Sequence, residues 1–109
     1  MTNLRKEARG RECQVRSAVC CFDPETTVLA HVRMSGISGM GYKAPDLLGA
    51  WACAACHTLV DTGRYATRDA EGREIHSVEL LPDERDLLLL RGVMRTQAQL
   101  IREDKLLCE

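Results

Sequence analysis

The segment from Trp51 to Asp61 carries two thiols, an imidazole and a carboxylate in under a dozen residues. Cys53 and Cys56 are separated by two residues, a spacing that lets both sulfurs bind one tetrahedral metal ion from a tight turn. If a helix begins there, His57 and Asp61 lie four residues apart and share one helix face. The segment therefore predicts a thiolate pair for a structural metal and a His/Asp pair directed elsewhere. We expect the chain to fold around it.

The remaining cysteines suggest how the thiolate pair is completed. They are Cys13, Cys20, Cys21 and Cys108. A single cysteine is usually a small buried apolar residue, but two clusters of cysteines favour a metal site. Cys13 and Cys20 would complete a four-thiolate zinc site with Cys53 and Cys56. The gap from Cys13 to Cys20 is wider than in a usual zinc knuckle, and Cys21 could replace Cys20. Cys108, in the polar tail, is expected to be free.

The bulk composition limits the possible functions. A chain of 109 residues is long enough for one domain with a modest core. It contains one Trp, two Tyr and one Phe, and a metal ion would offset this shortage of large apolar side chains. The net charge of -1 excludes a strongly basic chromatin-type protein. Basic residues gather near the N-terminus, however, so a local phosphate-binding face is compatible with the sequence.

The expected compartment follows from the first residues of the sequence and from the length of its apolar runs. Met1 leads directly into polar and charged residues, which is not the pattern of a signal peptide. No apolar run approaches the roughly 20 residues that span a membrane. We expect a cytoplasmic protein without membrane contact, in which six cysteines indicate metal binding in place of disulfides.

The first half of the chain predicts a β-hairpin that leads into the cysteine segment. The range Thr26–Val32 is β-branched and apolar, which is typical of a strand, and His31 lies near its end. The glycine-rich range 35–41 predicts a loop and lacks the Gly-Lys-Ser/Thr of a P-loop. Leu47–Ala52 is expected to form the second strand, with Asp46 at its start. A lone histidine on a strand is more often structural than catalytic, but this one precedes a metal-ligand motif.

Helices are expected on either side of this hairpin. A short one from Asn3 to Ala8 would be capped by Asn3. The helix that contains Cys56 should turn Leu59 and Val60 inward and end near Gly63. The longest helix should start at Pro82, and an apolar stripe at helical spacing should face the core. That stripe consists of Leu87, Leu90, Met94, Ala98 and Ile101, broadened by Leu88, Leu89 and Val93.

These elements predict an α+β fold in one domain. We expect a zinc-stabilised hairpin-helix core at about residues 11–64, an exposed arm at 64–79, and a C-terminal helix at about 82–105. Gly92 inside that helix weakens it and indicates close packing. The broad apolar face of the same helix could also serve as a homodimer surface.

The order of strand, loop, strand, thiolate turn and helix resembles the ββα-metal fold of HNH endonucleases, in the variety where paired cysteines bind zinc. Several segments are similar to a narrower group, the small YbcO-like nucleases of phages and prophages. They are Leu4-Arg5-Lys6, Ala8 to Arg16, Pro24-Glu25-Thr26, Leu29-Ala30-His31, Pro45-Asp46-Leu47, Ala52-Cys53, Ala55-Cys56-His57 and Met94 to Gln97. The resemblance covers most of the chain except the arm, which is longer here.

The resemblance implies a metal-dependent endonuclease that hydrolyses phosphodiester bonds, with DNA favoured over RNA. His31 would be the general base that activates water. His57 and Asp61 would bind a catalytic divalent ion such as Mg²⁺ or Mn²⁺. Asp46 occupies the place of an Asn that holds the loop orienting the base, and when ionised it cannot donate a hydrogen bond. The usual ligand before the base is replaced by Ala30.

Three basic residues are candidates to contact phosphates: Arg33, Lys43 and Arg64. On sequence alone each is equally compatible with an ordinary solvated charge.

Three other functions fit parts of the pattern. The first is a zinc-stabilised DNA- or protein-binding module without catalysis, in which His31 and His57 are structural. The second is a c-type cytochrome, because Cys53 to His57 matches the haem-attachment pattern Cys-x-x-Cys-His. Haem attachment requires export, which the sequence does not predict, so no haem is expected. The third is a dithiol oxidoreductase, but the motif does not follow a βαβ pattern.

Overall fold

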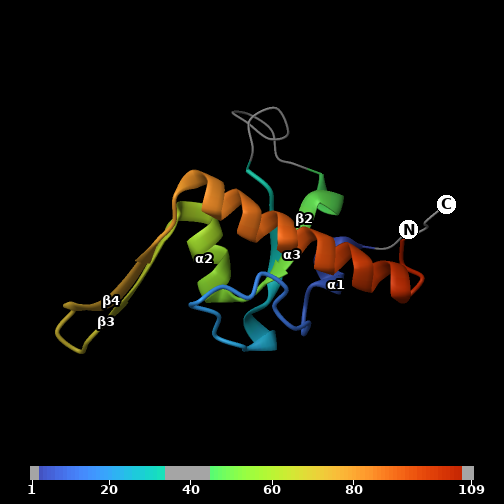
Figure 1. Cartoon of the computed structure of the whole chain (residues 1–109). Helices are drawn as coiled ribbons and strands as arrows, with labels where there is room; N and C mark the ends of the chain where they lie inside the picture. The colour runs from blue at the N-terminus through green and yellow to red at the C-terminus, as the bar shows by residue number, and fades with distance from the viewer. Residues whose placement is uncertain (1–2, 34–44, 107–109) are drawn as a thin grey trace.

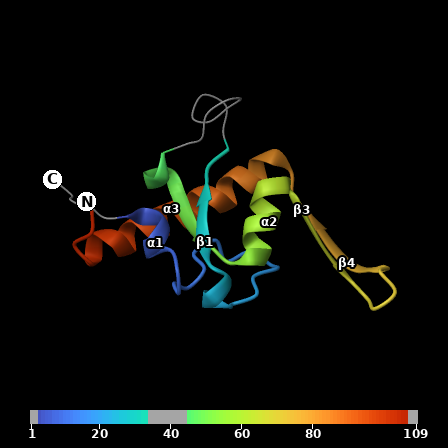
Figure 2. The same cartoon turned by 180° about the vertical axis from the view of Figure 1, so that it is seen from behind.

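The computed structural model describes residues 3–33 and 45–106, in which an α+β fold combines two short hairpins with a long C-terminal helix. Helix α1 and strand β1 come first in the chain. The long helix α3 packs across the β1–β2 hairpin, mainly against β2 (Figures 1 and 2). The bounds are α1 Leu4–Glu7, β1 Val28–His31, β2 Gly49–Ala52, α2 Ala54–Thr62, β3 Arg64–Arg68, β4 Glu74–Glu79 and α3 Pro82–Arg102, with 3-10 turns at Pro24–Thr26 and Asp46–Leu48.

The β1–β2 hairpin has the antiparallel pairing that the sequence predicts, with shorter strands. Val28 lies opposite Ala52 and His31 lies opposite Gly49. Because the strands are antiparallel, the end of β1 lies beside the start of β2, where the Asp46–Leu48 turn precedes it. The end of β2 lies at the other end of the hairpin and leads directly into the cysteines. The hairpin thus separates two groups of candidate site residues.

Helix α2 begins and ends as its sequence predicts. Cys53 is the N-cap, and its sulfur accepts a hydrogen bond from the backbone N–H of Cys56 at 3.4 Å. Gly63 ends the helix in the left-handed conformation with φ 80°, and its N–H donates to the Leu59 carbonyl at 2.7 Å. Leu59 and Val60 are buried, as expected. The helix therefore holds the second half of the cysteine motif in a rigid first turn.

The prediction for the core-facing side of α3 is right for Leu89 and Val93, which broadened the expected stripe, and wrong for most of the stripe itself. Of the expected stripe, Leu87, Leu90, Met94 and Ile101 are exposed. The buried face lies on the other side of the helix and comprises Leu89, Gly92, Val93, Thr96 and Leu100. Gly92 and Thr96 are not large and apolar, so hydrophobic periodicity identified only part of this face.

Specific contacts explain why a glycine and a threonine occupy that buried face. The Thr96 hydroxyl accepts the backbone N–H of Trp51 in β2 at 3.0 Å. A side chain at Gly92 would meet the Ala50 Cβ at 3.0 Å and the Val15 Cγ2 at 3.1 Å. Gly92 therefore allows α3 to approach β2 and the N-terminal segment closely, which confirms the close packing predicted there.

The predicted arm at 64–79 is the β3–β4 hairpin, which projects from the rest of the molecule (Figure 1). Its antiparallel register is interrupted between Thr67 and Arg68. Arg64 at its base pairs with Glu74, and the Arg64 Nε lies 3.2 Å from a Glu79 carboxylate oxygen. Most of its residues are exposed. No helix of the described ranges is long and apolar enough to cross a membrane.

Arg11 joins the N-terminal segment to the end of α3. Its guanidinium contacts Glu7 at 2.8 Å and Glu103 at 2.5 Å, and it lies 4.5 Å from the centre of the Trp51 ring. Lys105 contacts Glu7 at 2.8 Å. Hydrogen bonds from Lys105 and Arg11 lower the pKa of Glu7. The hydrogen bond from Arg11 is the main cause that holds the pKa of Glu103 well below its usual range.

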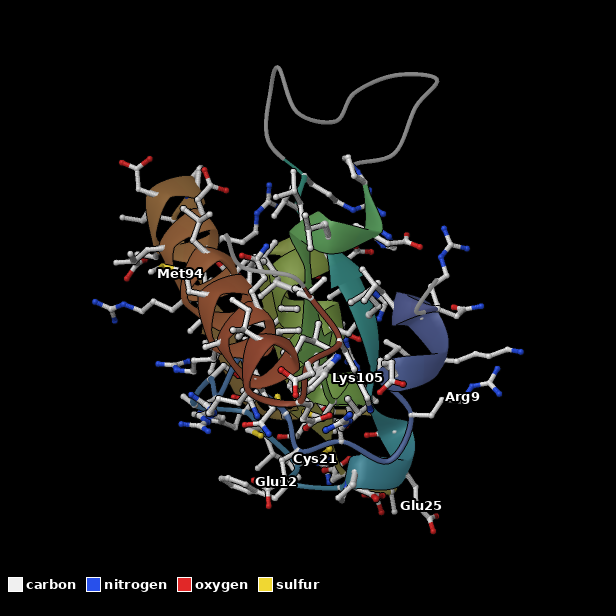
Figure 3. The ribbon with its side chains drawn as sticks, turned by 90° about the vertical axis from the view of Figure 1, so that its right-hand side faces the viewer. Arg9, Glu12, Cys21, Glu25, Met94 and Lys105 are labelled. Atoms are coloured by element: carbon white, nitrogen blue, oxygen red, sulfur yellow. The ribbon has the colours of Figure 1, made fainter. Side chains whose placement is uncertain are left out.

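Arg11→Met is expected to lower the free energy of unfolding by about 2 kcal/mol at neutral pH, because two carboxylates lose their shared donor. Both carboxylates have folded-state pKa values below the unfolded value, so their contribution is complete above about pH 4.5 and is lost as pH falls through the folded values. The variant should therefore differ from wild type less at acid pH. Urea unfolding at several pH values measures this. The control is Arg9→Met, since Arg9 is exposed (Figure 3), and an equal loss there would contradict the prediction.

Candidate functional site

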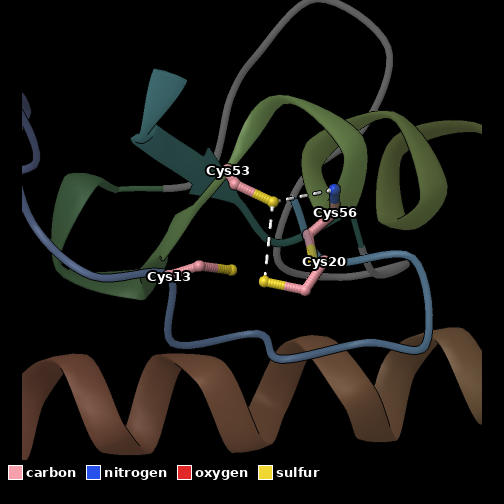
Figure 4. Close-up of side chains that lie close together, drawn as sticks. All are labelled: Cys13, Cys20, Cys53 and Cys56. Atoms are coloured by element: carbon pink, nitrogen blue, oxygen red, sulfur yellow. Dashed lines mark hydrogen bonds between the residues drawn. The ribbon is translucent and has the colours of Figure 1, made fainter. Parts of the chain in front are cut away.

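Four cysteines converge at one end of the β1–β2 hairpin (Figure 4). They are Cys13, Cys20, Cys53 and Cys56, and their sulfur atoms all lie within 4.8 Å of one another. This is the set that the spacing predicts. Cys13, Cys53 and Cys56 are buried, and Cys20 is partly buried. The cluster joins three separate parts of the chain: the segment after α1, the loop before β1, and the junction of β2 with α2.

Backbone contacts hold the first two cysteines against the second pair. The N–H of Gln14 donates to the Trp51 carbonyl at 2.7 Å, which fixes Cys13 beside β2. The N–H of Cys20 donates to the Ser17 carbonyl at 3.1 Å and closes a turn that directs its sulfur inward. The Cys20 and Cys53 sulfurs are 3.8 Å apart.

Cys21 lies outside this cluster. Its side chain is exposed and its sulfur is 3.6 Å from the Thr26 hydroxyl. Its backbone N–H instead donates to the Cys53 sulfur at 3.5 Å. The structure therefore selects Cys20 over Cys21 as the fourth member. Cys108, which was expected to be free, lies outside the described residues.

The chemistry of the cluster suits a cation. A hydrogen bond with Cys56 lowers the pKa of Cys13 to about 4, and the same contact raises the pKa of Cys56. Burial raises the pKa of Cys20 to about 11. The lowered pKa of Cys13 and the raised pKa values of Cys20 and Cys56 mean that these three thiols favour a single charge among them, because further negative charge in so small a volume is unfavourable. A metal ion would remove that penalty, and these four cysteines could hold one.

At the other end of the hairpin, His31 and Asp46 form a close pair. The Nε2 of His31 lies 2.7 Å from the Oδ1 of Asp46. The Nε of Arg5 donates to the same Oδ1 at 3.3 Å. The contact with His31 is the main cause that lowers the pKa of Asp46, and the hydrogen bond from Arg5 lowers it further. Nothing in the sequence singles out Arg5, which lies in a run of basic residues and reaches Asp46 only through the tertiary fold.

An ionised Asp46 determines the tautomer of His31. A carboxylate only accepts hydrogen bonds, so a neutral imidazole at this distance must carry its proton on Nε2. The lone pair is then on Nδ1, which can accept a proton from water. The pair can therefore act as an oriented base with a carboxylate behind it.

His57 and Asp61 belong to α2, and His57 is partly buried. The Nε of Arg33 lies 2.5 Å from Asp61 Oδ1. Arg33 lies two residues after His31, and Asp61 lies one turn after His57. The ion pair therefore brings the end of β1 against the side of α2 that carries the predicted ion ligands.

Two of the three residues predicted to contact phosphates lie in the described ranges, and both form ion pairs there. Arg33 is exposed and pairs with Asp61. Arg64 lies at the base of the arm and pairs with Glu74 and Glu79. Lys43 lies outside the described residues. Within residues 3–33 and 45–106, the arginines that contact the candidate site carboxylates are Arg5 and Arg33.

Comparison with known proteins identifies relatives over nearly the whole chain. The family described as "Putative nuclease YbcO" matches residues 2–105. The "Putative nuclease YbcO" of Escherichia coli K12 is 58% identical over 104 residues, which cover 94% of this chain and 95% of the relative. The protein of the same description from Enterobacteria phage 82 has the same identity and coverage. A solved structure described as a "putative bacteriophage protein" from E. coli K-12 has a TM-score of 0.65 and 36% identity, covering 94% of this chain and 100% of its own.

Proposed function

This chain belongs to the family described as "Putative nuclease YbcO", and from that premise we propose that it is a metal-dependent endonuclease of the HNH type. Its substrate is nucleic acid, with DNA favoured. The observation that carries this proposal is the His31–Asp46 pair, which lies at the strand end that the Arg33–Asp61 contact joins to α2. We propose that residues 1–109 form a single nuclease domain.

His31 accepts a proton from the attacking water through Nδ1. Asp46 holds the imidazole in the required tautomer, and Arg5 donates a second hydrogen bond to the same carboxylate oxygen. Asp46 thus stands where related sites have an Asn, but it contacts the base differently. Its carboxylate only accepts a hydrogen bond from the base, whereas a neutral amide could also donate one. The position before the base supplies no side-chain ligand, because Ala30 carries only a methyl group, which is buried.

His57 and Asp61 are the proposed ligands of a divalent ion such as Mg²⁺ or Mn²⁺. The bound ion would stabilise charge on the phosphate and on the departing 3′ oxygen. Arg33 contacts only the Oδ1 of Asp61, so the second carboxylate oxygen can bind an ion, and an Arg33 that leaves Asp61 becomes available to contact a phosphate. Lys43 and Arg64 remain further candidates for phosphate contact, and Arg64 would first have to leave its two glutamates.

The second metal site in the proposal is structural. Four thiolates within 4.8 Å of one another are the donor set of a closed zinc site. Such a site leaves no position open for substrate. We therefore assign zinc to the cysteines and catalysis to the histidine end of the hairpin.

The proposal is tested by incubating the purified zinc-loaded chain with plasmid, linear duplex, single-stranded DNA and RNA, with and without Mg²⁺ or Mn²⁺. We expect cleavage that depends on the added ion. His57→Ala should raise the ion concentration needed for half-maximal cleavage by about 10- to 100-fold. Thr58→Ala is the control, because Thr58 is the exposed neighbour. Wild-type protein that binds nucleic acid but never cleaves it would instead favour the zinc-stabilised binding module.

Asp46→Asn is expected to lower kcat by about 10- to 100-fold while KM changes little, because the tautomer of His31 is no longer determined. Arg5→Gln should have a smaller effect of about threefold, since Asp46 keeps its contact with His31. Without Arg5 the pKa of Asp46 lies closer to its usual value, so the carboxylate is protonated at a higher pH than in wild type. The effect of Arg5→Gln should therefore grow as pH falls. Rate–pH profiles of the three proteins measure this. Equal kcat for Asp46→Asn and wild type would contradict the role of Asp46.

A further inference from the structure

A pocket lies where the arm joins the rest of the molecule. It is formed by the end of α2, the base of the β3–β4 hairpin and the start of α3, which meet in Figure 1, and its volume is about 410 Å³. Its lining includes two arginines, Arg64 and Arg85, and one carboxylate, that of Glu79. The lining therefore carries an excess of one positive charge.

Hydrogen bonds fix the walls of this pocket. The Leu80 N–H donates to the Gly63 carbonyl at 2.9 Å, which ties the end of β4 to the end of α2. The Thr62 hydroxyl accepts the backbone N–H of Arg64 at 3.3 Å and so fixes the first residue of β3. Thr62 directly follows Asp61, the proposed ion ligand. The pocket therefore begins one residue beyond the proposed catalytic ion, on a wall that is already ordered.

The two arginines of the pocket differ in how their charge is balanced. Arg64 pairs with Glu74 and Glu79. Arg85 is partly buried, and within residues 3–33 and 45–106 its guanidinium forms no ion pair and no hydrogen bond. Its Nη1 lies 3.9 Å from the position that a Cβ on Gly63 would occupy, so the guanidinium stands beside the turn that ends α2. A partly buried charge without a counter-ion is unfavourable, and an anion in the pocket would supply one.

We propose that Arg85 binds a backbone phosphate of the nucleic-acid substrate in this pocket, next to the phosphate that is cleaved. The inference rests on the proposed nuclease function, since it is the position of Asp61 that brings a strand to the pocket. The planar guanidinium matches two oxygens of a phosphodiester. Glu79 opposes the phosphate, but its contact with Arg64 reduces the repulsion. A phosphate contact carries no sequence information, so Arg85 should strengthen binding to every sequence alike.

Fluorescence anisotropy tests the proposal with the zinc-loaded full chain and three short probes, which are a DNA duplex, a DNA single strand and an RNA single strand. No Mg²⁺ or Mn²⁺ is added, so binding is measured without cleavage. For the duplex, Arg85→Gln should raise Kd by about 5- to 10-fold at about 0.1 M salt, and it should lower the slope of log Kd against log salt by about 0.9, because one phosphate contact is lost. Arg91→Gln is the matched control, since Arg91 is an exposed arginine of the same helix outside the pocket, and its Kd should stay within about twofold of wild type.

The carboxylate of the pocket gives a test in the opposite direction. Glu79→Gln should lower Kd by about threefold, because it removes the negative charge that opposes the phosphate while Arg64 keeps its pairing with Glu74. Glu71→Gln makes the same change of charge on the arm outside the pocket, and it should leave Kd within about 1.5-fold of wild type. Circular dichroism and zinc content show that each variant is folded.

The position of the contact is tested by NMR of the arginine side chains. The Nε–H signal of Arg85 should shift when the DNA duplex is added, whereas that of Arg91 should not. Weaker binding by Arg85→Gln together with this shift supports the pocket even in a chain that never cleaves. An Arg85→Gln variant with unchanged affinity and salt slope overturns it, even where wild type cleaves DNA, as does an equal loss in Arg91→Gln. A wild-type chain that binds none of the three probes overturns both this inference and the nuclease proposal.

Discussion

His31→Ala is expected to reduce nucleic-acid cleavage by about 10²- to 10⁴-fold, which is the usual contribution of a general base. In the proposed mechanism the imidazole accepts the proton from water, and alanine offers no substitute. Asp46 keeps its contact with Arg5 in the variant, so the loss of His31 leaves that carboxylate paired. Initial rates of plasmid nicking at saturating Mg²⁺ or Mn²⁺ measure the effect.

The chain offers a matched control for this experiment. Of its three histidines, His76 lies exposed on the arm and takes no part in the candidate site. His76→Ala should therefore cleave at the wild-type rate. The zinc content and the unfolding midpoint of both variants should match those of wild type, because neither residue belongs to the cysteine cluster. Undiminished cleavage by His31→Ala would remove this residue from the mechanism.

Removal of the proposed structural zinc is expected to unfold most of the chain. A four-thiolate zinc site contributes about 10 kcal/mol or more to folding, which is comparable with the whole net stability of a typical domain. Cys56→Ser should reproduce the effect of chelation, since Cys56 is buried and contacts Cys13 and Ser17. Circular dichroism and metal analysis should show loss of helix together with loss of one zinc per chain.

Cys21, which lies next to the cluster in sequence, supplies a control for this experiment. Cys21→Ser should keep both zinc and helix, because the Cys21 side chain is exposed and outside the cluster. Zinc binding must displace the protons that burial and hydrogen bonding hold on Cys20 and Cys56, so affinity should fall as pH decreases. A metal-free protein with an unchanged spectrum and unfolding midpoint would show that the metal is not structural.

The cysteine cluster and α2 could be predicted from sequence because their signals are local. Two cysteines three positions apart, a following helix and a terminal glycine impose their geometry within a few residues. The pairing of Cys13 and Cys20 with them required a longer inference, but cysteines have few alternative uses in such a pattern. Only the choice between Cys20 and Cys21 had to come from the fold.

The orientation of α3 could not be predicted, because its sequence carries two apolar faces. Hydrophobic periodicity favours the row of Leu87, Leu90, Met94 and Ile101, which the structure leaves exposed. The buried face was selected by close contact at Gly92 and by the hydroxyl of Thr96, which satisfies a backbone N–H of β2. Neither feature contributes to an apolar pattern.

The sequence by itself determined the main α+β elements, three of the four clustered cysteines with Cys20 or Cys21 as the fourth, and the family to which the chain belongs. Only the tertiary structure decided that Arg5 pairs with Asp46 and that Arg33 pairs with Asp61. Both contacts join residues more than 20 positions apart, and arginine side chains are long enough to reach several partners. Short-range preferences set the elements, whereas the packing of α1 and β1 against their neighbours selects among those partners.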